Sequence, residues 1–484
     1  MIRAWSVDAV RRAEAAALAL APEGALMQRA AAALATRTAA LLRDRTGGVA
    51  GRRVVLLVGA GNNGGDALWA GARLARRGAR VDAVPAAGRV HAERLAALRA
   101  AGGRTVALDE ATAVLARADV VLDGLVGLGA TAGLRPSADA LVAAVPPTAA
   151  VVAVDLPSGV DPGTGHVPSA HVHADLTVTF GAAKPCLLLP PAAAAAGRVE
   201  VVDIGLDPAV LGPADVERLE ADDVAGRWPV PGPQDDKYSR GVLGVVAGGA
   251  RYTGAAVLCT GAAVRAGAGM VRYVGPAEPT DLVRARWPEV VPGGGRVQAW
   301  VLGPGVDPDD PVQRPAVQAA LGSDLPCLVD AGALDLLPPG GRRAPTLLTP
   351  HAGELARLLS RLEDGGCTRA DVLAAPVDAA RRAARRTGAT VLLKGSVTLV
   401  VPPEGPVRSQ PAGPAWLATA GAGDVLAGLA GVLLAAGLDP VDAGSLAVVV
   451  HAAAAHAASG GGPLAAGQVL DAVPAAVARL LRAG

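Results

Sequence analysis

Aromatic residues, paired cysteines and long uninterrupted apolar runs are all scarce in this sequence of 484 residues. Only 2% of the residues are aromatic, whereas 51% are hydrophobic, so small aliphatic side chains must build the core. Such a core favours layers of helices and sheets over an aromatic-rich β-sandwich. Gly, Pro or a charged residue breaks every Ala-rich stretch before about 18 residues, so we predict no membrane-spanning helix.

The four cysteines lie far apart and form no Cys-x-x-Cys pair, which argues against both a zinc site and a disulfide framework. A reducing cytoplasm is the simplest setting for such a chain. The net charge is only +1, with no basic face and no acidic tail, so we expect neither a nucleic-acid nor a membrane partner. Residues 1–31 mix Arg and Glu with apolar residues, which is typical of an amphipathic helix rather than a signal peptide.

Apolar strand-like segments alternate with helical segments along most of the chain, which predicts α/β folds with mostly parallel sheets covered on both faces. Prolines and charged residues at 206–236 interrupt this alternation, and the chain is too long for one core. We therefore predict two fused domains, at residues 1–222 and 223–484. In the first half the predicted strands are 54–58, 78–84, 119–122, 151–159, 175–181 and 198–205, and the predicted helices are 1–46, 66–77 and 90–101. A second α/β series includes the segments 241–249, 299–305, 325–332, 346–354 and 389–396, with a strand-to-helix turn at 348–354.

A Gly-rich turn, Gly-Ala-Gly-Asn-Asn-Gly-Gly-Asp at 59–66, joins the first of these strands to a helix. A tight turn would account for the glycines, and backbone amides at a helix N-terminus also suit an anionic phosphate. Two amides and a carboxylate crowded together exceed what a turn needs. Asp123, Asp155 and Ser158 end two later strands, and strand carboxyl ends line the ligand crevice of an open parallel sheet. Lys184, after a further strand, either contacts phosphate or closes the sheet edge.

These motifs occur in the order of the NAD(P)H-hydrate epimerase family, which residues 1–215 resemble. The resemblance rests on the turn, on the segment Asp-Gly-Leu-Val-Gly-Leu-Gly at 123–129 and on Val-Asp-Leu-Pro-Ser-Gly-Val-Asp at 154–161. It implies a Rossmann-like, doubly wound sheet. One departure is Leu128, where the family usually has a hydroxyl-bearing Thr. The substrate-binding residues implied are Asn62, Asn63, Gly64, Gly65, Asp66, Gly127, Leu128, Gly129, Ala130, Thr131, Ala132, Gly133 and Asp155.

The same resemblance assigns chemistry to the polar strand ends. Asp155 is implied as the acid/base at C6 of the dihydropyridine ring, although an Asp that caps a turn would look the same in sequence. A potassium ion is implied at Asn63, Asp123 and Ser158. All three side chains offer oxygen, which suits a hard cation.

In the second half, the Gly-rich loop Ala-Thr-Ala-Gly-Ala-Gly-Asp at 418–424 enters a helix. The amides of Gly421–Gly423 can stabilise negative charge that develops during phosphoryl transfer, and Asp424 can take a proton from an attacking hydroxyl. An N-cap Asp behind a flexible loop would have the same local pattern. The other motifs are Tyr-Thr-Gly-Ala-Ala (252–256), Gly-Pro-Gly (303–305), Thr-Pro-His-Ala-Gly-Glu (349–354) and Lys-Gly-Ser-Val-Thr (394–398).

This set resembles the ribokinase-like NAD(P)H-hydrate dehydratases over about residues 236–480. The resemblance implies a ribokinase-like α/β/α sandwich, ADP as the phosphoryl donor and Mg²⁺ as its metal. The family commonly has Asp-Ala-Asp where this chain has Asp330-Ala-Gly332. The residues implied to contact the hydrated nucleotide are Ala255, Gly305, His351 and the catalytic Asp424. Those implied to contact the adenine nucleotide are Lys394, Gly395, Ser396, Val397, Thr398 and Gly423.

The two resemblances together imply a bifunctional repair enzyme for hydrated NADH and NADPH. The first domain would interconvert the R and S epimers, and the second would dehydrate the S epimer, giving NAD(P)H, AMP and phosphate. The alternative is a small-molecule kinase of the ribokinase-like fold with a fused, non-catalytic Rossmann-like nucleotide-binding module. Both folds often associate, so we expect a homo-oligomer.

Overall fold

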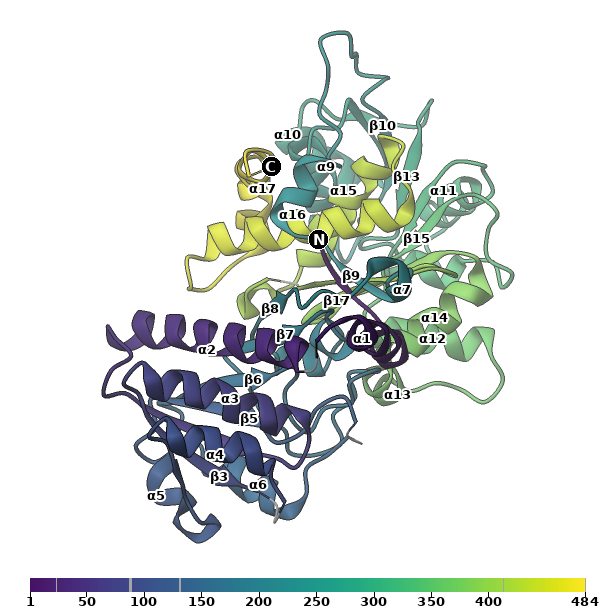
Figure 1. Cartoon of the computed structure of the whole chain (residues 1–484). Coiled ribbons are helices and arrows are strands. Elements are labelled where there is room, and N and C mark those ends of the chain that lie inside the picture. Colours follow the sequence, from purple (N-terminus) through teal and green to yellow (C-terminus); the bar gives the residue numbers. More distant parts are fainter. Residues whose placement is uncertain (23, 87–88, 130–131, 412, 484) are drawn as a thin grey trace. The chain divides into compact units, whose positions relative to one another are not determined.

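The chain forms two compact units in a computed structural model that describes residues 1–483 except 23, 87–88, 130–131 and 412. Arg3–Val216 form the N-terminal unit, and Glu217–Gly484 form the C-terminal unit together with Met1–Ile2. Each unit has an α/β architecture (Figure 1), as predicted. The domain limits 1–222 and 223–484 stay a prediction.

Seven parallel strands form the sheet of the N-terminal unit, in the order β4-β3-β2-β5-β6-β7-β8. The strand order reverses between β2 and β5, which makes the sheet doubly wound. The strands are β2 (Arg53–Val58), β3 (Arg80–Pro85), β4 (Arg104–Thr105), β5 (Val120–Gly124), β6 (Ala150–Val154), β7 (Leu176–Phe180) and β8 (Arg198–Val202). The helices are α1 (Val7–Leu20), α2 (Ala25–Thr46), α3 (Asn62–Arg76), α4 (Ala92–Ala100), α5 (Ala111–Leu115), α6 (Pro136–Ala143) and α7 (Pro208–Leu211).

The two faces of this sheet carry different helices, because neighbouring side chains of a strand point to opposite sides. Val54, Leu56 and Val58 of β2 pack in one core cluster with residues of α2 and α3. Val55 and Leu57 pack in another cluster with residues of α5 and α6. Helices α2, α3 and α4 lie side by side over their face (Figure 1). Burial on both faces explains why the strands are continuous apolar runs.

Two predicted helices differ from those observed. The helix predicted over 1–46 is interrupted, because a short strand β1 (Ile2–Ala4) precedes α1 and a turn separates α1 from α2. Gly24 caps α2 with a φ of 74°, a conformation that glycine adopts without strain. Helix α3 begins at Asn62 rather than at residue 66, so the polar turn is itself the first turn of the helix.

An eleven-stranded sheet, in the order β1-β9-β18-β17-β16-β15-β14-β13-β10-β11-β12, contains the strands of the C-terminal unit. Strands β10 to β16 are parallel, whereas β17 is antiparallel to both of its neighbours, β16 and β18. The strands are β9 (Val216–Arg218), β10 (Val242–Val246), β11 (Met270–Val274), β12 (Val291–Pro292), β13 (Ala299–Leu302), β14 (Cys327–Val329), β15 (Thr346–Leu348), β16 (Thr390–Leu393), β17 (Val397–Val401) and β18 (Val407–Pro411). The helices are α8 (Ala221–Ala225), α9 (Thr253–Arg265), α10 (Ala277–Arg286), α11 (Gln313–Leu321), α12 (Ala352–Leu362), α13 (Arg369–Ala374), α14 (Pro376–Thr387), α15 (Ala422–Ala435), α16 (Pro440–Ser459) and α17 (Ala466–Leu481).

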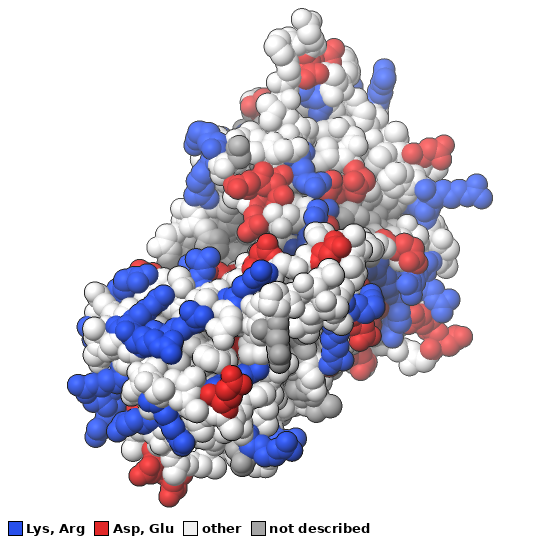
Figure 2. All heavy atoms as spheres, viewed as in Figure 1, with Lys and Arg blue, Asp and Glu red and all other residues white. Residues whose placement is uncertain are grey.

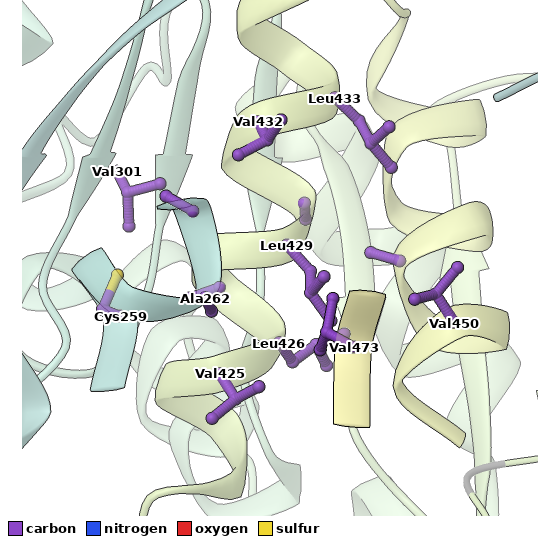
Figure 3. Close-up of a cluster of buried hydrophobic side chains, with 14 of the residues drawn as sticks. Cys259, Ala262, Val301, Val425, Leu426, Leu429, Val432, Leu433, Val450 and Val473 are labelled. Atoms are coloured by element: carbon purple, nitrogen blue, oxygen red, sulfur yellow. The ribbon is translucent and has the colours of Figure 1, made fainter. Parts of the chain in front are cut away.

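Small aliphatic side chains of α9, α15, α16 and α17 form the largest part of the core of this unit (Figure 3). Gly428 lets α15 approach α9 closely, because a Cβ there would lie 2.3 Å from the Cys259 carbonyl oxygen. Close packing of these helices holds the N-terminus of α15 in place. Leu426, Leu429 and Val450 point into this cluster (Figure 3).

Helix α16 is long and apolar enough to cross a membrane, which the broken Ala-rich pattern had not predicted. The structure buries 61% of its apolar window within the protein. Leu446 and Val450 of this helix belong to the core cluster, so its composition reflects packing in the core.

Basic side chains gather where α2 and α3 end in the N-terminal unit (Figure 2). Arg43 and Arg45 lie in the last turn of α2, and Arg73 and Arg76 lie in the last turn of α3. Positive charge is favourable there, because a helix C-terminus carries partial negative charge. This patch is at the opposite end of α3 from Asn62.

Candidate active sites

A cavity of about 880 Å³ lies at the carboxyl ends of β2, β5 and β6 in the N-terminal unit. Residues of α1 and α2 complete its wall. The predicted binding residues that line it are Asn62, Asn63, Asp66, Gly127, Leu128, Gly129, Gly133 and Asp155. Among the described residues, Gly64, Gly65 and Ala132 are not part of the lining, and Ala130 and Thr131 lie outside the described residues.

The two glycines of the polar turn face the protein interior instead of the cavity. A Cβ at Gly64 would lie 2.1 Å from the carbonyl oxygen of Gly59. A Cβ at Gly65 would lie 1.5 Å from Nη1 of Arg94, which comes from α4. Both positions therefore permit close packing of the start of α3, and their predicted contact with substrate stays a prediction.

Asp155 follows β6 directly and has a φ of 71°, a backbone conformation that is rare for residues other than glycine. Its Oδ1 accepts hydrogen bonds from Lys184 Nζ, from Thr179 Oγ1 at 3.0 Å and from the amide of Phe180 at 3.3 Å. Lys184 is fully buried and also donates to Thr179 Oγ1 and to the Phe180 carbonyl. Lys184 is thus the ion-pair partner of Asp155, a role that neither of its two predicted alternatives included.

Two further carboxyl groups, those of Asp66 and Glu14, line the same cavity. Burial raises the pKa of Asp66 to about 7, the nearby Arg94 opposes this shift, and Asp155 and Glu14 add to it. Burial also raises the pKa of Glu14. The Asp66 Oδ1 atom is buried and has no hydrogen-bond partner among the described residues.

The three residues predicted to hold potassium lie together beside this cavity. Ser158 donates to Asp123 from its hydroxyl at 2.6 Å and from its amide at 2.8 Å. The amide of Val126 donates to Ser158 Oγ, and Asn63 Nδ2 donates to the carbonyls of Val126 and Val154. This leaves Asn63 Oδ1 available as a donor oxygen.

Asp123 is a buried carboxyl that has no ion-pair partner within the described part of the chain. Burial raises the pKa of Asp123 to about 6, against the effect of the hydrogen bonds from Ser158 and Leu125. Buried carboxylates normally pair with a cation or a metal ion. An all-oxygen donor set with an uncompensated carboxylate fits a hard cation such as potassium.

In the C-terminal unit, polar residues follow adjacent parallel strands. Asp330 comes directly after β14, His351 follows β15 and Lys394 comes directly after β16. Lys394 Nζ lies 2.8 Å from Asp330 Oδ1 and 3.9 Å from Glu354 Oε2. His351 caps α12, because its Nδ1 accepts from the amides of residues 353 and 354. In return, Glu354 Oε2 accepts from the backbone amide of His351. The structure therefore brings His351 and Lys394 together, and it adds Asp330 and Glu354.

Asp424 joins this cluster from the first turn of α15. Burial raises the pKa of Asp424 to about 7; Asp330 adds to the shift and Lys394 opposes it. A Cβ at Gly423 would lie 3.5 Å from Lys394 Nζ, so the loop and the lysine are neighbours. A carboxyl group that titrates near neutral pH is well suited to act as a general base.

The remaining predicted residues of this unit fall into two groups. A Cβ at Gly305 would lie 2.7 Å from the Cβ of Ala255, so these two residues are in contact. Cys259 lies one turn after Ala255 on α9. Burial raises the pKa of its thiol, and the nearby Asp424 and Asp330 raise it further. Gly395 and Ser396 are exposed, Val397 is half-buried and Thr398 is buried, at the turn between β16 and β17.

Steric crowding explains why position 332 is a glycine in this chain. It lies in a short 3-10 helix (Ala331–Leu336), and a Cβ at this position would lie 2.1 Å from the Val306 carbonyl oxygen. The larger residue common in the family would require this loop to move. Asp330 keeps its contact with Lys394 and is the more informative of the two positions.

Comparisons with known proteins agree with this geometry. Residues 243–465 match the family described as NAD(P)H-hydrate dehydratase, and residues 23–186 match the family described as YjeF-related protein N-terminus. The bifunctional NAD(P)H-hydrate repair enzyme Nnr of Mycobacterium tuberculosis is 51% identical over 90% of this chain and 89% of that protein. Its counterpart in Mycobacterium leprae is 50% identical over 95% of each chain.

A solved structure resembles the C-terminal part. The ADP/ATP-dependent NAD(P)H-hydrate dehydratase from Bacillus subtilis, co-crystallized with ATP/Mg²⁺, is 26% identical with a TM-score of 0.50, and the match covers 54% of this chain and 97% of that one. This supports the ribokinase-like fold of the second half. Because near-complete relatives share half of its residues, the chain belongs to the family of bifunctional NAD(P)H-hydrate repair enzymes.

Proposed function

We propose that the chain repairs hydrated NADH and NADPH in two steps. The N-terminal unit interconverts the R and S epimers, and the C-terminal unit dehydrates the S epimer at the expense of ADP, giving NAD(P)H, AMP and phosphate. Family membership supports the repair activity. The observation that carries the chemistry is Asp424, which lies at a helix N-terminus beside Lys394 and titrates near neutral pH.

The proposed dehydration converts a poor leaving group into a good one. Asp424 takes the proton of the C6 hydroxyl as that oxygen attacks the terminal phosphorus of ADP, and the bond to the AMP oxygen breaks. The amides of Gly421–Gly423 and the ammonium of Lys394 face the negative charge that develops. Phosphate then leaves C6 and a proton leaves C5, which restores the dihydropyridine.

The described residues contain no group of three His, Cys, Asp or Glu side chains that would form a metal site. A protein usually binds Mg²⁺ through one or two carboxylates plus substrate phosphates. Asp330 and Glu354 offer such carboxylates, and bound Mg²⁺ supplies charge neutralisation on the nucleotide phosphates. The choice of ADP over ATP is part of the proposal, since the similar Bacillus subtilis enzyme is described as ADP/ATP-dependent.

In the N-terminal unit, Asp155 is the proposed acid/base at C6, and Lys184 holds its carboxylate in one orientation. Asn63, Asp123 and Ser158 would hold potassium, whose positive charge balances the buried Asp123. Leu128 lines the cavity where the family has a hydroxyl, so an apolar surface faces the substrate there. A homo-oligomer and a cytoplasmic location remain predictions, which light scattering and cell fractionation test.

The test mixes the purified chain with both epimers of hydrated NADH and Mg²⁺, adds ADP, ATP or neither, and follows the absorbance of the reduced nicotinamide. Full recovery with ADP supports both activities and the choice of donor. If only the absorbance due to one epimer is recovered, the dehydratase activity is supported, but the N-terminal unit is a binding module without epimerase activity. A stable phosphorylated product without recovery would favour the kinase alternative.

A further inference from the structure

We propose that Asp66 is a second catalytic residue of the epimerase site, which donates the proton to the C6 hydroxyl while Asp155 accepts the proton of the incoming water. This inference rests on the proposed epimerase function. It assigns separate tasks to two carboxyl groups that line the same cavity. The resemblance to the epimerase family implied only substrate contact for Asp66.

The first observation is an unsatisfied buried oxygen. Asp66 lies in the opening turns of α3, is only 7% exposed and lines the cavity. Its Oδ1 finds no hydrogen-bond partner in the part of the chain that the structure describes. An unsatisfied buried polar group costs about 1–3 kcal/mol, so its presence requires an explanation. A hydrogen bond between this carboxyl and a substrate hydroxyl supplies the missing partner.

The second observation is the contrast between the surroundings of the two carboxyls. Asp155 accepts hydrogen bonds from the buried ammonium of Lys184, from Thr179 and from the Phe180 amide. Asp66 has no comparable set of donors among the described residues. The charged groups that face it are Arg94 from α4, Glu14 from α1 and Asp155 itself.

Burial of Asp66 and repulsion from the two other carboxylates outweigh the attraction of Arg94, and the pKa of Asp66 rises to about 7. A substantial share of Asp66 is therefore protonated at neutral pH, whereas the Asp155 side chain is paired with the buried ammonium of Lys184. Two carboxyl groups with surroundings this different are the usual arrangement for a general acid and a general base.

The proposed step conserves atoms and electrons. The Asp66 proton moves to the C6 hydroxyl oxygen, the C6–O bond breaks, and its electron pair leaves with water while the N1 lone pair forms an N1=C6 bond. Water then adds to C6 from the other face, the electron pair returns to N1, and the water gives its proton to Asp155. After the step Asp66 is ionised and Asp155 is protonated, and conversion of the epimers in the opposite direction starts from this state.

The test is Asp66→Asn in the full chain, with epimer exchange followed by chromatography in the absence of ADP and ATP. We expect the rate of exchange to fall at least 100-fold, because a positioned acid typically contributes 10²–10⁴-fold. Asp44→Asn, on the exposed end of α2, is the matched control and keeps the wild-type rate. Dehydration of the purified S epimer in the same samples shows that the C-terminal unit is folded, and calorimetry shows whether the N-terminal unit, Arg3–Val216, still unfolds at the wild-type temperature.

Two further readouts separate proton donation from a structural role. Small carboxylic acids should restore exchange to Asp66→Ala, because they can supply the missing proton. In H₂¹⁸O, the wild type should place one solvent oxygen on C6 for each epimerisation. Wild-type exchange in Asp66→Asn, or epimerisation without label, would overturn the Asp66 proposal alone, whereas a wild-type chain without any exchange would overturn the proposed function of the N-terminal unit.

Discussion

The buried ion pair between Lys184 and Asp155 offers a direct test of how the N-terminal site is built. Lys184→Met keeps most of the side-chain volume and removes the charge. The Asp155 carboxylate would then stay buried, with Thr179 and the Phe180 amide as its remaining hydrogen-bond donors among the described residues. The side chains of the pair are 0% and 7% exposed, so bulk solvent screens the unpaired carboxylate only weakly.

The expected magnitude follows from this burial. Removing one partner of a buried ion pair typically costs about 3–5 kcal/mol of unfolding free energy. For a unit of the size of Arg3–Val216, each kcal/mol lowers the melting temperature by about 2–4 °C, which gives a fall of about 6–20 °C. The double variant Lys184→Met/Asp155→Asn removes the unpaired charge, so we expect it to be more stable than Lys184→Met.

Calorimetry and urea unfolding of the wild type, both single variants and the double variant measure this coupling. Dehydratase activity reports on the C-terminal unit in the same samples, and epimer exchange should be lost in Lys184→Met. A loss below about 1 kcal/mol in Lys184→Met, with no recovery in the double variant, would refute the assignment of a buried ion pair.

Three other predictions concern the remaining site residues. Burial raises the pKa of Asp424 to about 7, and a general base works in its ionised form, so the rate of dehydration should fall about tenfold per pH unit below pH 7. Asp424→Asn should lose the activity and still bind nucleotide. A flat pH profile between about pH 5 and 8 would contradict this role. Gly64→Ala should lower the free energy of unfolding of the N-terminal unit by more than about 2 kcal/mol in urea, because its Cβ would meet the Gly59 carbonyl. The control Gly61→Ala has open space around its Cβ and should lower the free energy of unfolding by less than about 1 kcal/mol. Potassium should raise the thermal stability of the N-terminal unit relative to tetramethylammonium, and Asp123→Asn should remove this difference; equal melting temperatures of the wild type in both salts would argue against the ion.

The fold was predictable because its periodicities are local. Continuous apolar strands such as 54–58, between Gly-rich turns and helices, identify parallel sheets without any knowledge of tertiary contacts. The interruption near Gly24 escaped prediction because Ala-rich helical segments lie on either side of it. The early start of α3 at Asn62 escaped prediction because its first residues, 62–66, are Asn, Gly and Asp, which are poor helix formers. Helix α16 is ambiguous in sequence for a similar reason, since core packing and membrane insertion select the same composition.

The partners of the predicted site residues were harder to predict from the sequence, because they depend on the order of the strands in the sheet. Lys184 follows β7, and only the pairing of β7 with β6 places it against Asp155. Asp330 acquires its contact with Lys394 through the neighbouring positions of β14, β15 and β16. Asp330 directly follows the buried strand β14, and this pattern can be recognised in sequence, whereas Lys184 lies four residues beyond the end of β7.

The order in which the site residues occur along the chain has a consequence for synthesis on the ribosome. Every residue that builds the N-terminal cavity has been added by residue 204, whereas the C-terminal cluster lacks its base until Asp424. At about 5–20 residues per second, the growing chain carries a complete set of N-terminal site residues for about 10–45 s before Asp424 is added. The first unit can therefore fold and begin to exchange epimers while the second is still being translated.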